Sequence, residues 1–221
     1  MVTQELINQM IPPLKPSDKA KKALSWMEEL RVSQLPVVFQ ERFLGFISEE
    51  AILEQNNPDQ LIESFELEDI TCTVQGHQHF FDAMKIASDY DSELVTVLDP
   101  ANNYLGVITI VDTISAVAQT AAVQSPGGIL VLSMQQIDYS LAEIARLVES
   151  DNAKIIGSSI LNDPSDPSKI KLTLKINKVD LTRVIATLER FGYVVVAKFQ
   201  EEVMISNEKE RLDILLKFLD I

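Results

Sequence analysis

The 221-residue sequence is poor in the residue types on which most catalytic proteins depend. It has one cysteine, Cys72, and two histidines, His77 and His79. A single thiol excludes an internal disulfide framework and fits a reducing cytoplasm, where we expect the protein to reside. Phosphate-binding loops, nucleophile elbows and zinc-protease motifs are missing from the sequence as well. We therefore predict a protein without enzymatic activity.

Basic residues and long apolar runs are also scarce. Lysine and arginine together number 19 against 33 acidic residues, which gives a formal net charge of −14. Nucleic acids and anionic membranes require clustered positive charge, so we expect neither as a partner. No apolar run reaches the 18 or so residues needed for a membrane span, and the N-terminus shows no signal pattern. These features predict a soluble protein.

What the sequence does contain is a tandem repeat. The stretch Tyr104–Ile114 matches Phe43–Leu53, and in both an aromatic residue and a leucine precede a glycine, two apolar residues and a hydroxyl residue. We interpret each copy as a strand that runs into a helix, with Ser48 or Thr109 at the helix N-cap. The similarity extends upstream at a displacement of about 60 residues. A fixed internal period predicts that the first half of the chain is a duplicated β-α-β-β-α unit.

The pattern changes after the Pro-Gly-Gly segment near residue 126. Alternating apolar and polar residues at 170–177 predict a sheet with one buried face, and the order of elements in this part is βαββαβ. The expected class is α/β (α+β), with a ferredoxin-like second half. The predicted boundaries are residues 1–62 with an N-terminal helix at Thr3–Met10, 63–124, a linker at 125–128, 129–200, and a C-terminal helix within 201–221, at Glu208–Leu219.

The repeat resembles a pair of CBS (cystathionine-β-synthase-type) domains. The stretches that carry the resemblance are Leu35–Val38, Gly45–Ser48, Val97–Asp99 and Gly106–Asp112. Residues 129–199 look like an ACT-type regulatory domain by topology. The combination resembles the acetoin-utilisation B-type proteins. It implies a non-catalytic regulatory protein, often dimeric, that binds an adenosine nucleotide and acts on a protein target that the sequence does not name.

The resemblance also implies which residues hold the nucleotide. The hydroxyl of Thr109 would face the phosphate and the carboxylate of Asp112 would bond the ribose hydroxyls. The adenine slot would be formed by the strand that enters the second repeat and by the strand after its first helix, which gives the list Ile70, Thr71, Cys72, Val95 and Thr96. Thr96 stands where the first repeat has a proline. No basic residue lies beside Thr109 in the sequence, which favours AMP over ATP.

Physical chemistry leaves two interpretations of Thr109 and Asp112 open. Free N–H groups at a helix N-terminus attract an anion, and a carboxylate can accept two hydrogen bonds from a cis-diol. The same spacing is also typical of a capping box, which is purely local. In the first repeat Ala51 replaces the carboxylate, so Ser48 is expected to act only as a cap.

Two other candidate sites have ordinary alternatives. His77 and His79 could chelate a metal, but no third ligand is near in sequence and a solvated loop is the better explanation. ACT domains usually bind an amino acid at a position that corresponds here to Met134–Tyr139. Gln135 and Gln136 could bond such a ligand, although a turn capped by Asp138 explains the segment too.

We also expect a homodimer. The predicted helix Val111–Val123 carries an apolar face that would be too large for a monomer, and Tyr193–Val196 is apolar on both faces of its strand. The alternative is that the C-terminal helix covers one of these surfaces within the same chain. For the function, a nucleotide sensor and a ligand-free assembly module remain the two hypotheses, and Asp112 is the residue that distinguishes them.

Overall fold

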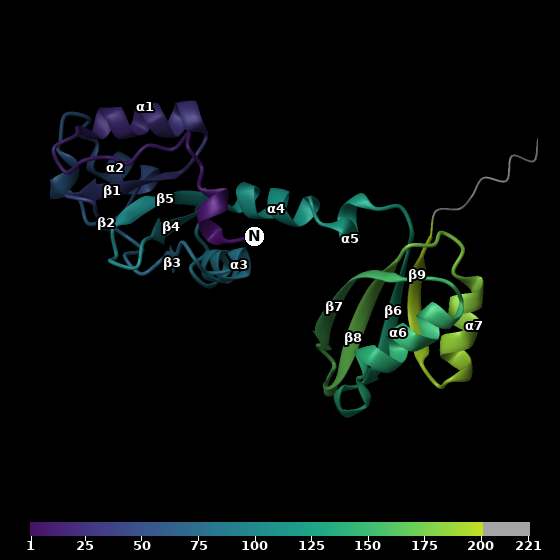
Figure 1. Cartoon of the computed structure of the whole chain (residues 1–221). Helices are drawn as coiled ribbons and strands as arrows, with labels where there is room; N and C mark the ends of the chain where they lie inside the picture. The colour runs from purple at the N-terminus through teal and green to yellow at the C-terminus, as the bar shows by residue number, and fades with distance from the viewer. Residues whose placement is uncertain (201–221) are drawn as a thin grey trace, which may run out of the picture. The chain divides into compact units, whose positions relative to one another are not determined.

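The computed structural model describes residues 1–200 and shows two compact units, whose boundary falls between Gln119 and Thr120 (Figure 1). The predicted helix Glu208–Leu219 lies outside the described residues. Helices and several separate sheets alternate along the chain, so the mixed α+β class is confirmed. Within residues 1–200, no helix combines the length and the apolar character that a membrane span requires.

The first unit contains both repeats in the predicted order. Its elements are η1 (Thr3–Leu6), α1 (Ala20–Leu30), β1 (Gln34–Phe39), β2 (Arg42–Ser48), α2 (Glu49–Gln55), η2 (Ile62–Ser64), β3 (Thr73–Gln75), α3 (Phe80–Asp89), β4 (Leu94–Leu98), β5 (Tyr104–Thr109) and α4 (Ile110–Ala118). β1 and β2 form an antiparallel hairpin, and β3, β4 and β5 form a three-stranded sheet in that order. Both predicted hairpins are confirmed, and a helix follows each of them.

The entering strand of the first repeat is shorter than its counterpart β3. It consists of one parallel bridge from Leu14 to Val37, made by the Leu14 N–H to the Pro36 carbonyl and by the Val38 N–H to the Leu14 carbonyl. Proline has no N–H to donate to a ladder, and prolines lie on both sides of Leu14 in this segment. The ladder therefore cannot extend beyond a single bridge.

Each repeat is completed by the segment that precedes the other one. The N-terminal segment pairs with β5 through a bridge between Asn8 and Val107, and the segment before the second repeat pairs with β2 through a bridge between Glu68 and Phe46. Asn8 and Glu68 occupy equivalent positions, 60 residues apart in the alignment of the repeats. The two repeats thus exchange the segments that precede their entering strands, whereas Leu14 and β3 pair within their own repeats.

The glycine of the repeated motif is explained by this exchange. A Cβ atom at Gly106 would lie 2.4 Å from Ile7 Cγ2, and one at Gly45 would lie 2.8 Å from Leu67 Cβ. Ile7 and Leu67 belong to the two exchanged segments. Glycine therefore occurs in both copies because any side chain would collide with the segment that crosses the strand.

The two repeats share one hydrophobic core, which includes Met27 and Phe46 from the first and Leu94 and Ile108 from the second. A polar contact links the repeats: Glu93 Oε2 accepts hydrogen bonds from the Ser33 N–H (3.2 Å) and hydroxyl (2.9 Å). Ser33 and Glu93 are equivalent positions of the two repeats, so this contact lies where the repeats meet symmetrically.

Several predicted boundaries in this unit are wrong. The N-terminal helix is a single 3₁₀ turn, because residues beyond it become extended to pair with β5. α1 has Lys19 at its N-cap and no side-chain cap, and Asp18 accepts a bond from the Lys15 N–H. The predicted helix Val111–Val123 is broken at Gln119 and Thr120, and its second part, α5 (Ala121–Gln124), belongs to the second unit.

The second unit has the predicted βαββαβ order. After α5 it contains β6 (Gly128–Gln135), η3 (Gln136–Asp138), α6 (Leu141–Ser150), β7 (Ile155–Asp163), β8 (Asp166–Ile176), α7 (Thr182–Arg190) and β9 (Val194–Phe199). The strand order is β7-β8-β6-β9, and α6 and α7 cover one face of the sheet (Figure 1). Leu130, Leu172, Ile144 and Val184 are buried between them. The ferredoxin-like topology is confirmed.

The hairpin between β7 and β8 is tight, because β7 extends to Asp163 and β8 begins at Asp166. α6 is capped by Ser140, whose hydroxyl accepts a bond from the Glu143 N–H at 3.4 Å, and not by Asp138. Gly192 has a φ of 88° directly after the Phe191 C-cap, the left-handed conformation typical of a glycine that ends a helix.

Candidate functional site

Thr109 and Asp112 form a complete capping box at the start of α4. The Asp112 N–H donates to Thr109 Oγ1 at 3.0 Å, and Asp112 Oδ2 accepts from the Thr109 N–H at 2.9 Å and from the Thr109 hydroxyl at 2.7 Å. β5 ends directly at Thr109, so the strand fixes where this cap stands. The capping box that the spacing predicts is therefore present. Within it the Thr109 hydroxyl donates its proton to Asp112.

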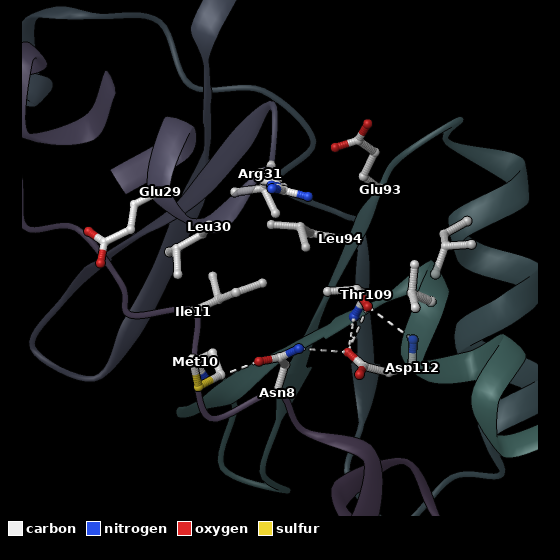
Figure 2. A pocket seen from close by; sticks show the side chains of 13 residues that line it. Asn8, Met10, Ile11, Glu29, Leu30, Arg31, Glu93, Leu94, Thr109 and Asp112 are labelled. Carbon is white, nitrogen blue, oxygen red and sulfur yellow. Dashed lines mark hydrogen bonds between the residues drawn. The ribbon is translucent and has the colours of Figure 1, made fainter. Parts of the chain in front are cut away.

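The capping box does not use the whole carboxylate. A third bond to Oδ2 comes from Asn8 Nδ2 at 3.1 Å, across a separation of 104 residues (Figure 2). Among residues 1–200, nothing donates to Oδ1 of Asp112. Asn8 is held in turn by its Oδ1, which accepts from the Met10 N–H at 2.9 Å. One oxygen is thus fixed by the protein, and the other is available to a ligand.

This carboxylate lies at the edge of a cavity of about 640 Å³. Ligand pockets commonly have this size and are mostly apolar, with a few polar groups. The apolar part of the wall comes from four regions: the N-terminal segment, the end of α1 with the residues after it, the start of β4, and the junction of β5 with α4. Its residues are Met10, Ile11, Leu30, Val32, Leu94, Ile110 and Val111. The predicted Thr109 and Asp112 are both at this cavity.

Arg31 is the basic residue that sequence reasoning missed. It lines the same cavity and occupies the left-handed C-cap position of α1, with a φ of 57°. None of the carboxylates among residues 1–200 lies within ion-pair distance of its guanidinium. In the view of Figure 2, Arg31 and Glu93 lie at one end of the cavity and Asn8 and Asp112 at the other. Arg31 belongs to the first repeat and Thr109 to the second, so no local signal in the sequence indicates that the two residues line one cavity.

The first turn of α4 supplies one further donor. Its Ile110 N–H bonds the Glu93 carbonyl at 3.1 Å, and its Asp112 N–H is taken by Thr109. The Val111 N–H has no partner within the described part of the chain. A helix N-terminus with a free N–H favours an anion. Arg31 and Val111 are therefore the donors available to an anionic group in this cavity.

The five residues expected to form the adenine slot do not line this cavity. Cys72, Val95 and Thr96 are buried in the core, where the Cys72 Sγ donates to the Leu94 carbonyl at 3.4 Å and desolvation raises the thiol pKa to about 11. Ile70 is exposed in a turn before β3, which begins only at Thr73.

The fifth, Thr71, donates its hydroxyl to the Tyr90 hydroxyl at 2.7 Å. The reason for the mismatch is the exchange of segments. Met10 and Ile11 hold, at the Thr109 cavity, the positions that Ile70 and Thr71 hold in the other repeat.

The first repeat has a carboxylate near its helix cap, although Ala51 replaces the aspartate of the motif. Ser48 caps α2 as predicted, with its hydroxyl accepting from the Ala51 N–H at 3.3 Å. The same hydroxyl donates to Glu68 Oε1 at 3.1 Å. Glu68 is the counterpart of Asn8. In the second site the carboxylate is on the helix, at Asp112, whereas in the first it is on the segment before the repeat, at Glu68.

The remaining sequence candidates are placed as follows. His79 is the N-cap of α3, where its Nδ1 accepts from the Phe81 N–H at 3.4 Å. In the second unit Gln135 ends β6 and Gln136 begins the 3₁₀ turn before α6. Gln135, Gln136, the exposed Ile137 and Ser168 line an open hollow of about 360 Å³.

Comparison with known proteins gives no match to a family model. Solved structures with similar coordinates include a CBS domain pair/ACT domain protein from Thermotoga maritima, at 17% identity and a TM-score of 0.49 over 54% of this chain and 98% of that one. CBS domains of a transcriptional regulator from Streptococcus pneumoniae match at 19% identity and a TM-score of 0.47, over 52% and 98%.

The CBS-pair protein CBSX2 of Arabidopsis thaliana, in complex with AMP, matches at 17% identity and a TM-score of 0.45, over 53% and 96%. Each of these likenesses covers about half of this chain. What the cavity binds has to follow from its own residues and their geometry.

Proposed function

We propose that residues 1–119 form a CBS domain pair that binds an adenosine nucleotide, with AMP as the representative ligand, and that the protein is a non-catalytic sensor. The single observation that carries the proposal is the Asp112 carboxylate at the cavity. One of its oxygens is fixed by Thr109 and Asn8, and the other is available to accept hydrogen bonds from a ribose cis-diol. The apolar wall fits a base.

The charges at the cavity favour a ligand with few phosphates. Arg31 and the Val111 N–H can contact one phosphate, but Glu29 and Glu93 also line the cavity. The phosphate partner in this arrangement is Arg31, because the hydroxyl of Thr109 is bonded to Asp112. Arg31 comes from the end of α1, whereas the ribose carboxylate comes from the start of α4.

The test is calorimetric titration of the full chain with AMP. Asp112→Asn keeps the shape of the cap but removes the charge, so AMP affinity should fall at least tenfold, in line with the ~1.5–3 kcal/mol of a charged hydrogen bond. Ser48→Ala is the matched change in the first repeat and should leave the affinity almost unchanged. Equal AMP affinity in the wild type and Asp112→Asn would refute the site.

A homodimer is the second part of the proposal. On α4, Val111 is 68% exposed and Ile114 is 57% exposed. Two large aliphatic side chains one turn apart on the same helix form an apolar surface that a second copy of the chain could cover with its own α4. A sensor of this kind would transmit its state to a protein target through its assembly. Its second unit, by its topology, would be an ACT-like domain.

A further inference from the structure

We infer that Glu93 is a specificity-determining residue that limits the ligand of this cavity to a single phosphate. The inference rests on the proposed nucleotide site and names the chemical class it accepts: a nucleoside monophosphate, with di- and triphosphates rejected by charge. It follows from the residues that line the space next to Arg31, on the side of the cavity away from Asp112.

A second cavity of about 770 Å³ adjoins the first. The two share Arg31, Val32 and Glu93 as lining residues. A ligand whose ribose contacts Asp112 and whose first phosphate contacts Arg31 would place any further phosphates toward this second space. The residues that line the second cavity therefore decide whether a polyphosphate chain is tolerated.

The second cavity is acidic. Glu28, Glu49 and Glu93 line it, against the basic residues Lys21 and Arg31. The Lys21 Nζ is already paired with Asp59 at 3.0 Å. A β- or γ-phosphate would therefore meet three carboxylates, and among residues 1–200 Lys21 and Arg31 are the only basic residues that line this cavity.

Glu93 is the carboxylate nearest to the division between the two cavities, because it is the only one of the three that lines both. It cannot readily swing away, since its Oε2 accepts from both the Ser33 N–H and the Ser33 hydroxyl. Its carbonyl also bonds the Ile110 N–H at the start of α4. The negative charge is thus held between the repeats beside Arg31, where a second phosphate would arrive.

The experiment compares AMP and ATP affinities by calorimetry in the full-length wild type, Glu93→Gln and Glu50→Gln. In Glu93→Gln the new amide oxygen would still accept from Ser33, so the fold is retained while the charge is removed. Glu50 is exposed on α2, lines neither cavity and provides a control for the loss of one charge from the acidic unit. The quantity of interest is the ratio of the ATP and AMP dissociation constants.

In the wild type we expect ATP to bind at least tenfold more weakly than AMP, with the difference shrinking as salt is added. Glu93→Gln should lower the ratio at least fivefold, a lower bound for removing one like charge several ångströms away near a protein surface once salt screening is included, and Glu50→Gln should leave it unchanged. An unchanged ratio in Glu93→Gln, or an equal reduction in Glu50→Gln, would overturn the role of Glu93. If AMP still binds when the ratio is unchanged, the proposed function stands and only the role of Glu93 is refuted. If neither nucleotide binds the wild type, both the proposed function and the role of Glu93 are refuted.

Discussion

Replacing Gly106 by alanine should damage nucleotide binding without touching any group that would contact the ligand. The new Cβ would lie 2.4 Å from Ile7 Cγ2, far inside van der Waals contact, and Ile7 is β-branched and cannot easily turn aside. The N-terminal segment must therefore shift away from β5. That segment carries Asn8, which bonds Asp112, and Met10, which lines the cavity. We expect AMP affinity to fall at least tenfold.

Gly45→Ala is the matched control, because its Cβ would lie 2.8 Å from Leu67 Cβ in the other exchanged segment. Overpacking costs about 1–3 kcal/mol of unfolding free energy, so both variants should show a similar drop in urea denaturation. Only Gly106→Ala should lose affinity beyond twofold in calorimetry at a temperature where both are folded. Equal losses of affinity in the two variants, or wild-type affinity in Gly106→Ala, would show that the N-terminal segment does not build the site.

Two further predictions concern assembly and the buried thiol. Ile114→Glu should place a charge in the proposed dimer contact, so light scattering should give about twice 24.7 kDa for the wild type and about 24.7 kDa for the variant, and a wild-type mass near 24.7 kDa would refute the dimer. For Cys72, burial raises the pKa to about 11, so roughly one thiol in a thousand would be ionised at pH 8. At pH 8 Ellman's reagent should label the native protein very slowly and react quickly only after denaturant is added. The slow labelling rate of the native protein should rise with pH. Rapid labelling of the native protein at pH 8 would contradict the burial of Cys72.

The repeat and its local elements could be predicted because they depend on short-range signals. Gly45 and Gly106, the N-caps Ser48 and Thr109, and the alternating apolar residues of β8 all act on their immediate neighbours. The capping box at Thr109 was recognisable for the same reason. The errors at the N-terminus have the opposite origin, since residues after Leu6 follow the pairing with β5 and not their own helical pattern.

The walls of the cavity could not be predicted, because they depend on which repeat each entering segment joins. The sequence pattern is the same whether Met10 packs on its own repeat or on the other one. Assigning the slot to Ile70 and Thr71 assumed that the segment before β3 lies against its own repeat. Tertiary pairing places Met10 and Ile11 at the cavity instead, and there Arg31 of α1 lines a site whose carboxylate lies on α4.

The two repeats differ at the positions that surround their helix caps, so the duplicated unit can hold one asymmetric ligand site. Two identical repeats would present the same groups twice, but here the equivalent positions carry opposite chemistry. Asn8 faces Asp112 in one half, and Glu68 faces Ser48 in the other. Arg31 corresponds to Asp91, which has the same left-handed backbone. The cation that lines the Thr109 cavity therefore has an acidic residue at the equivalent position of the other repeat, so the proposed anionic ligand would meet Arg31 at this cavity.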